Sequence, residues 1–175
     1  MEFQNAGIDT SHLPKAAELS LQPVDPNYLA VLRAQWAIGW LFVALLTAIA
    51  IYFSEGLHSL TWIIVISLAV IVVALLNWWL VKRSFEYKAF AIREHDIVYR
   101  TGWLVQSTRV CPFNRIQHCS VDIGLFERKY GLATLSVYTA GGNEADMKIP
   151  GLQASMAGDL RELIIRKTGI DESTS

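Results

Sequence analysis

The sequence predicts a membrane-spanning helical hairpin followed by a mainly-β soluble domain that ends in a single helix. The first observation is a pair of long apolar runs, 34–53 and 60–81, separated by a short polar break. The second is a change from continuous to alternating hydrophobicity after Arg83, which indicates strands. The third is an amphipathic stretch near the C-terminus. The hairpin is therefore placed at 29–81, and a soluble domain at 82–169.

The hydrophobic bias of the chain is local. Hydrophobic residues make up 53% of the sequence and charged residues 18%, with a net charge of −1. Outside 34–81 the composition is that of a soluble protein, and the bases are scattered among acids. Nucleic-acid binding requires a concentrated basic excess, so no nucleic-acid partner is expected.

Residues 1–28 predict a flexible or surface-lying arm. They are polar and contain three prolines, at 14, 23 and 26. They lack the basic and then apolar organisation of a signal peptide, so the first membrane helix is expected to act as its own insertion signal. The sequence Asp25-Pro26-Asn27 predicts a turn that leads into this helix.

Each apolar run is long enough to cross a bilayer. About 20 residues of helix span a hydrocarbon core of roughly 30 Å, and only a helix satisfies its own backbone there. Within 34–81 the only acid is Glu55 and the only histidine is His58, and both lie in the polar break. The alternative, a buried helix pair in a soluble protein, is disfavoured because soluble helices rarely stay apolar on every face.

Basic residues at the helix ends predict the orientation of the hairpin. They lie just before the first run and just after the second, whereas the connecting break has no Lys or Arg. The positive-inside rule therefore places both termini in the cytoplasm, with a multi-pass protein in the cytoplasmic membrane. Tryptophans near the same ends are expected to lie at the interface. The predicted anchors are Arg33, Trp36, Trp78, Trp79, Lys82 and Arg83.

The soluble domain begins with alternating segments that predict short antiparallel strands. They are bounded by turns at 94–96, 113–115 and 140–143, by a loop at 124–130, and by Pro150-Gly151, which is expected to end the sheet. The predicted strands are 84–93, 97–101, 103–112, 116–123, 134–139 and 146–149.

A helix is predicted after the last strand. Ser155 is a candidate N-cap, Asp159 suits the first turn, and Gly169 is a good C-terminal stop. Met156, Leu160, Leu163 and Ile164 fall on one face. Such a stripe suits a helix that closes the open end of a small antiparallel barrel. Residues 170–175 form a polar tail.

Four short motifs of this domain occur in a recognisable order. They are Pro112–Gln117 (PFNRIQ), Gly124–Leu132 (GLFERKYGL), Thr139–Gly142 (TAGG) and Ile149–Leu152 (IPGL). The succession resembles the bacterial pleckstrin-homology-like (bPH2) domain of small two-helix membrane proteins, the YdbS-like family, over about residues 29–168. The resemblance implies a seven-strand sandwich or barrel capped by a C-terminal helix. It implies no established reaction. It also implies, as a partner, a larger membrane protein that carries related domains.

Arg115 and Gln117 belong to the most specific of these motifs and are candidate ligand- or partner-binding residues. The planar guanidinium of Arg115 suits a lipid phosphate or a partner carboxylate. The alternative is that Arg115 ties its turn to backbone carbonyls.

Arg128 and Lys129 form a second candidate site. A basic pair beside Phe126 and Tyr130 can rest on an anionic membrane surface. The alternative is a solvated loop whose aromatic side chains pack inward.

Neither a catalytic nor a metal site is expected. No histidine is spaced with a second His, Cys or acid in a metal-binding pattern. Cys111 and Cys119 lie symmetrically about Arg115, so a tight hairpin could bring them together, but a cytoplasmic location favours free thiols. No general base, carboxylate pair or nucleophile elbow stands out, and no cofactor is expected.

The leading hypothesis is a membrane-anchored, non-enzymatic binding or scaffold module that engages a partner membrane protein, with anionic lipid as a further candidate ligand. Tethering raises effective concentration, so weak contacts would suffice. The alternative is an accessory subunit of a transport, export or envelope-stress system. The apolar runs contain no ionisable group, which argues against transport by the chain alone. Gly39 and nearby alanines favour helix packing, including self-association.

Overall fold

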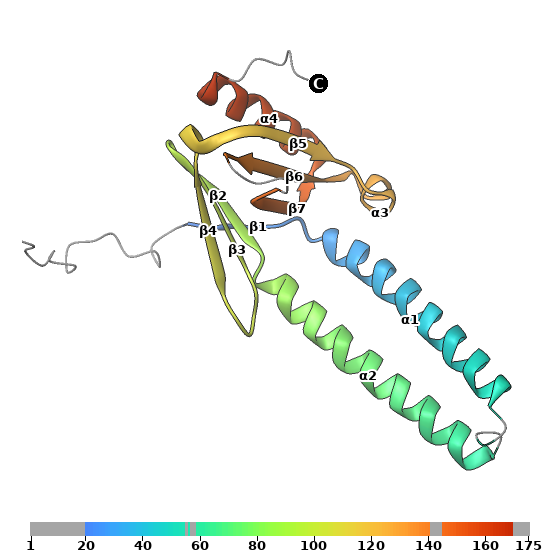
Figure 1. Ribbon diagram of the computed structural model, residues 1–175. Coiled ribbons are helices and arrows are strands. Elements are labelled where there is room, and N and C mark those ends of the chain that lie inside the picture. Colours follow the sequence, from blue (N-terminus) through green and yellow to red (C-terminus); the bar gives the residue numbers. More distant parts are fainter. Residues whose placement is uncertain (1–19, 55, 57–58, 141–144, 170–175) are drawn as a thin grey trace, which may run out of the picture.

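The computed structural model describes residues 20–54, 56, 59–140 and 145–169. Two long helices project side by side from a small β-sandwich that carries a third helix on its far side (Figure 1). This is the predicted architecture, a helical hairpin long and apolar enough to span a membrane, joined to a mainly-β domain that ends in a helix. The predictions for the 1–19 part of the arm, for most of the break at 55–58, for the turn at 141–143 and for the 170–175 tail lie outside the described residues.

The two helices of the hairpin are longer than the predicted spans. Helix α1 (Tyr28–Phe53) follows the predicted turn, in which the Asn27 amide donates to Asp25 Oδ1 over 2.8 Å. Helix α2 (Leu60–Glu86) runs past the predicted end of the apolar run. Both are long and apolar enough to cross a membrane.

The prediction of a strand over 84–93 was wrong for its first residues. Residues Ser84–Glu86 are helical, and Arg83 forms an ion pair with Glu86 one turn on, at 3.1 Å. The alternating pattern there is too short to distinguish a strand from the end of a helix. Strand β2 (Ala89–Ile92) is what remains of the prediction.

Residues 20–27 are not part of a flexible arm. Strand β1 (Gln22–Pro23) pairs antiparallel with β2, matching Gln22 to Phe90 and Pro23 to Ala89. Val24 is only 2% exposed, and the Asp25 amide donates to the Gly151 carbonyl over 2.9 Å. The hairpin is therefore inserted between two neighbouring strands of one sheet, and the sandwich holds the chain on both sides of it.

The sandwich consists of two antiparallel sheets, in the orders β1-β2-β3-β4 and β5-β6-β7. Predicted boundaries shifted in three places. Residues 103–106 form a turn rather than the start of a strand, the 124–130 loop contains a short helix, and the last strand passes through Pro150-Gly151 with a register shift opposite Ala133–Leu135. The remaining elements are β3 (Asp96–Thr101), β4 (Ser107–Pro112), the 3-10 turn η2 (Phe113–Arg115), β5 (Ile116–Asp122), α3 (Leu125–Lys129), β6 (Leu132–Thr139) and β7 (Met147–Gln153).

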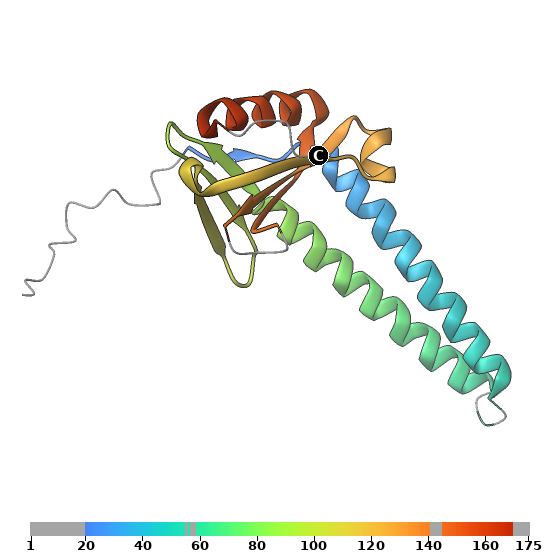
Figure 2. The same ribbon diagram turned by 45° about the horizontal axis from the view of Figure 1, so that its top comes forward.

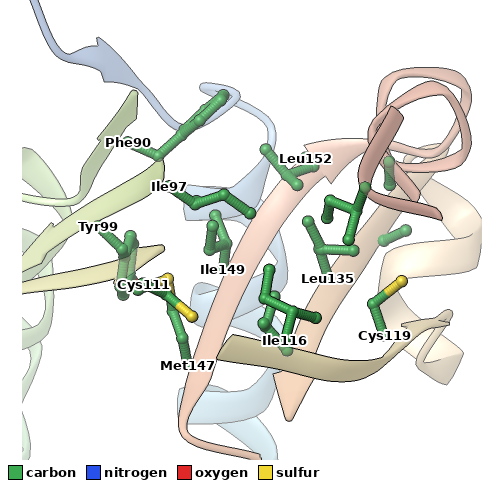
Figure 3. Packing of buried hydrophobic residues seen from close by; sticks show 14 of the residues in the cluster. Phe90, Ile97, Tyr99, Cys111, Ile116, Cys119, Leu135, Met147, Ile149 and Leu152 are labelled. Carbon is green, nitrogen blue, oxygen red and sulfur yellow. The ribbon is translucent and has the colours of Figure 1, made fainter. Parts of the chain in front are cut away.

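The core lies between the two sheets (Figure 3). Side chains from β2, β3 and β4 meet those from β5, β6 and β7, because alternate residues of each strand point inward. The labelled members are Phe90, Ile97, Tyr99, Cys111, Ile116, Cys119, Leu135, Met147, Ile149 and Leu152.

Helix α4 (Ala154–Thr168) closes the sandwich on the side away from the hairpin (Figure 2). It buries Ala157 and Ile164. The prediction that Ser155 caps this helix was wrong: the N-cap is Gln153, two residues earlier, and it makes no side-chain cap hydrogen bond. The Ala154 amide instead donates to the Gly131 carbonyl over 2.9 Å, so a neighbouring loop fixes the start. Gly169 ends the helix as predicted, in the left-handed conformation.

Candidate functional site

The structure does not bring the two predicted basic sites together. Arg115 ends η2 and Gln117 lies at the start of β5, whereas Arg128 and Lys129 lie on α3, beyond the other end of β5. A seven-residue strand spans more than 20 Å, so the two pairs mark opposite ends of the second sheet. All four side chains are exposed.

Helix α3 is fixed by its acid rather than by its bases. Glu127 accepts hydrogen bonds from the Gly124 amide at 2.9 Å and from the Thr134 hydroxyl at 2.8 Å. Phe126 and Tyr130 are half-buried, and the Lys129 ammonium lies 5.8 Å from the Tyr130 ring centre. The basic pair is thus displayed on a short, well-anchored turn of helix.

A different set of bases lines a groove between the sheets at the base of the hairpin. The groove has a volume of about 420 Å³. Three bases and three hydroxyl groups face it, and no carboxylate side chain is among its lining residues. We call it the basic groove; its lining residues are Lys88, Tyr99, Thr101, Arg109, Thr134, Ala145, Lys148 and Pro150.

Two of the lining residues fix the basic groove next to the membrane. Lys88 follows the end of α2 by two residues, and its amide donates to the Phe85 carbonyl over 3.0 Å. Pro150 precedes Gly151, which touches Tyr28 at the start of α1. Burial lowers the pKa of Lys88 and raises that of Tyr99. An anion in the basic groove would therefore restore a favourable environment for the charged Lys88 side chain.

Arg109 is held in place on one side of this groove. Its guanidinium donates to the Asp146 carbonyl over 2.8 Å, which joins β4 of one sheet to the start of β7 in the other. The Asp146 carboxylate accepts from the hydroxyl and the amide of Thr139, at 2.6 and 2.8 Å. These hydrogen bonds hold the pKa of Asp146 below its usual range. Arg109 also borders a second hollow of about 310 Å³ that reaches Arg115.

Sequence reasoning missed most of the basic groove. Lys88, Arg109 and Lys148 are absent from the candidate sites predicted from the sequence. Arg109 faces Tyr99 in the β3–β4 register, so it shares the inward face of the sheet with a core residue. The sequence does contain a clue, because Arg109 lies opposite a buried residue of the neighbouring strand. This clue can be recognised only when the strand register is known.

Cys111 and Cys119 are free and buried, as expected, but they do not face each other. Cys111 pairs with Ile97 in the first sheet and Cys119 with Val137 in the second. Residues 111–119 do not form a hairpin, because η2 carries the chain from one sheet to the other. Burial raises the pKa of both thiols, which disfavours the nucleophilic thiolate. Among the described residues, no group of three or more His, Cys, Asp or Glu could hold a metal ion.

Tryptophans connect the two helices where they meet the soluble domain. Trp36 of α1 lies 5.5 Å from Trp78 of α2, measured between ring centres, and the Trp40 indole donates to Asn77 Oδ1 over 3.3 Å. Trp79 lies 5.1 Å from Trp103 of the soluble domain, and the Arg83 guanidinium lies 5.9 Å from the Trp79 ring centre. Three of the predicted anchors therefore make contacts that fix the helices to each other or to the domain.

Further from the soluble domain, an open apolar crevice of about 400 Å³ lies between the two helices. Small and weakly polar side chains line much of it. The residues are Ala44, Thr47, Ala48 and Ile51 of α1, and Ile63, Ser67, Val70 and Ile71 of α2. The Thr47 hydroxyl donates a hydrogen bond to the Val43 carbonyl over 2.8 Å, so the crevice presents no unpaired threonine donor.

Comparison with known proteins agrees with this architecture. A protein-family model described as "Bacterial PH domain" matches residues 30–168. The chain is also similar to the UPF0699 transmembrane protein YdbS of Bacillus subtilis (strain 168), with 32% identity over 77 residues. That match covers 44% of this chain and 46% of the relative, so less than half of the relative is spanned. No solved structure matches the chain significantly.

Proposed function

The chain belongs to the bacterial PH domain family, and from that premise we propose that it is a non-enzymatic binding module anchored in the membrane. The hairpin binds helices of a partner membrane protein, and the soluble domain binds beside it at the membrane surface. The family is a transmembrane, PH-like family without an assigned reaction. The basic groove offers binding groups rather than an activated nucleophile.

The open crevice of the hairpin is the observation that carries the proposal. Helices pack in lipid through close contact between small residues, and Ala44, Ala48 and Ser67 provide such a surface. The Trp36–Trp78 contact joins α1 and α2 near the soluble domain, away from the crevice. A partner helix that entered the crevice would supply the packing that the two helices leave unmade.

The proposed setting is the bacterial inner membrane with both ends of the hairpin on the cytoplasmic side. The flanking bases Arg33, Lys82 and Arg83 support this orientation. Protease added to closed spheroplasts should leave the soluble domain intact, and protease added after lysis should remove it. Digestion before lysis would contradict the orientation.

Photo-crosslinking in the native membrane tests the partner. A crosslinking residue at Ala48, inside the crevice, should give an adduct with a second protein. Leu46 is the matched control, because two residues turn a helix by about 200° and place it on the opposite face. Equal adducts at both positions, or adducts with lipid alone, would contradict the proposal. An adduct with a second copy of the chain would identify the partner as the chain itself.

Deletion of the soluble domain distinguishes the binding module from an accessory transport subunit. If residues 1–86 alone sustained the cellular activity of the full chain, binding by the sandwich would be dispensable and the module hypothesis would fail. A partner adduct that survives only in the full chain supports the module.

The basic groove favours an anionic lipid headgroup as a second ligand. Lys88, Arg109 and Lys148 converge on a hollow at the base of the hairpin, and a juxtamembrane base contributes about 1 kcal/mol to binding an anionic surface. Lys148→Ser should therefore lower retention of phosphatidylglycerol by about fivefold in native mass spectrometry of the purified full chain. Lys129→Ser, on α3, is the control and should change little. Equal losses would mean that the chain attracts anionic lipid only through its overall charge.

A further inference from the structure

We propose that the β3–β4 loop, Gly102–Gln106, inserts its tip into the inner leaflet beside α2. Leu104 and Val105 enter the bilayer interface, so the soluble domain contacts lipid directly as well as through the hairpin. This contact depends on apolar area rather than on headgroup charge, and it is separate from the crevice and the basic groove.

The tip of this loop is the first observation. Leu104 is 77% exposed and Val105 is 80% exposed, although most large apolar residues of the sandwich are buried. The tip is followed by the polar residues Gln106, Ser107 and Thr108. An apolar tip on a polar stem is the arrangement found in segments that enter the membrane interface.

The position of the loop relative to α2 is the second observation. Trp103 packs edge-to-face on Trp79, with ring centres 5.1 Å apart and an interplanar angle of 82°. Trp79 lies seven residues before the end of α2, which corresponds to about 10 Å along the helix axis. The loop therefore extends beyond the inner end of α2, along the membrane-spanning part of the helix. Both ribbon views show β3 and β4 projecting on the side of the sandwich from which the hairpin leaves (Figures 1 and 2).

The α2 surface at this level faces lipid, which is why the occupant is lipid rather than a protein. Leu75, Leu76, Trp79 and Leu80 are exposed large apolar residues at helical spacing. The Arg83 guanidinium, one turn further, lies over Trp79 and suits the headgroup level. Trp79 and Trp103 thus connect the lipid-facing surface of α2 with the loop. Tryptophan itself favours the membrane interface.

The turn is rigid enough to present its tip. Gly102 has a φ of +91°, and a Cβ at this position would lie 2.1 Å from the Val105 carbonyl oxygen. Only glycine permits this close approach, so the turn holds Leu104 and Val105 away from the sheet. The loop then acts as a third support for the domain, next to the two connections through the hairpin, and fixes which face of the sandwich rests on the membrane.

A lipid-sensitive probe on the tip tests the insertion. The full chain with Val105→Cys is labelled with the fluorophore NBD and placed in nanodiscs that contain spin-labelled lipid in the upper acyl chain. Thr108→Cys, three residues further along the chain in β4 and at most about 10 Å away, is the matched control. Labelled wild-type protein sets the background from the buried Cys111 and Cys119.

The expected result is blue-shifted emission at position 105 with quenching about twofold or more stronger than at position 108. The difference should persist when phosphatidylglycerol is replaced by phosphatidylcholine, because apolar insertion needs no charge. Equal quenching at both positions would overturn the proposal. A blue shift at position 105 without lipid quenching would overturn it as well, because the tip would then be covered by protein.

Discussion

Replacing Gly151 by alanine should lower the free energy of unfolding of the soluble domain by about 2–4 kcal/mol. Gly151 has a φ of +71°, and an added Cβ would lie 2.6 Å from Tyr28 Cγ and 2.8 Å from Tyr28 Cβ. Tyr28 is the first residue of α1, so it cannot retreat without moving the hairpin. The Gly151 carbonyl also accepts from the Asp25 amide, so the same shift would strain the connection between β7 and the segment that precedes α1.

Gly131→Ala is the control that separates the clash from the backbone cost. Gly131 has a similar φ of +65°, but a Cβ there would meet nothing within 4 Å. It should cost only about 1–2 kcal/mol. Urea unfolding of the full chain in nanodiscs, followed by circular dichroism in the β region, measures both. Equal losses would show that Tyr28 does not hold Gly151 in place.

Ile149→Ala should destabilise the sandwich by about 2–5 kcal/mol. Ile149 of β7 is fully buried, pairs with Leu135 of β6, and lies in the core between the two sheets (Figure 3). Truncation removes apolar contacts and leaves a cavity, because a closely packed core relaxes only partially around the missing atoms. The loss is a large part of the 5–15 kcal/mol that stabilises a typical domain.

A differential thermal scan of the full chain checks this second result. The transition of the soluble domain should fall by roughly 10 °C or more, because 1 kcal/mol corresponds to about 4–8 °C in a domain of this size. Ile123→Ala, at an exposed position after β5, is the control and should change stability by less than about 0.5 kcal/mol. A similar shift in both variants would mean that the core does not limit the stability of the domain.

The sequence contained most of the architecture because its hydrophobic patterns are unambiguous over long stretches. The runs 34–53 and 60–81 predict membrane helices by length alone, and the segments around Val98 and Val137 predict strands because β-branched and aromatic residues lie between turns. The boundary errors arose where local signals compete. Ser84–Glu86 continues a helix despite its alternating pattern, and Pro150-Gly151 stays in a strand because a register shift accommodates it.

The candidate site was harder to predict because it depends on contacts between distant segments. Arg115 and Arg128 stand out in short motifs, yet the basic groove is built from Lys88, Arg109 and Lys148, which come from three separate strands or strand edges. No short sequence pattern predicts that these three residues lie together. The pairing of Gln22 with Phe90 was missed for the same reason, since a two-residue strand has no period of its own.

That pairing has a consequence for biosynthesis. Strand β1 is translated before both membrane helices, and its partner β2 is translated after them. The first sheet cannot be completed until the hairpin has been made and its two ends brought together. Insertion of both helices into the bilayer brings these two ends together, because the second helix returns the chain to the side of the membrane where β1 lies. Completion of the first sheet therefore requires that both helices have crossed the bilayer, and a chain with a half-inserted hairpin would leave β1 and the edge of β2 unpaired.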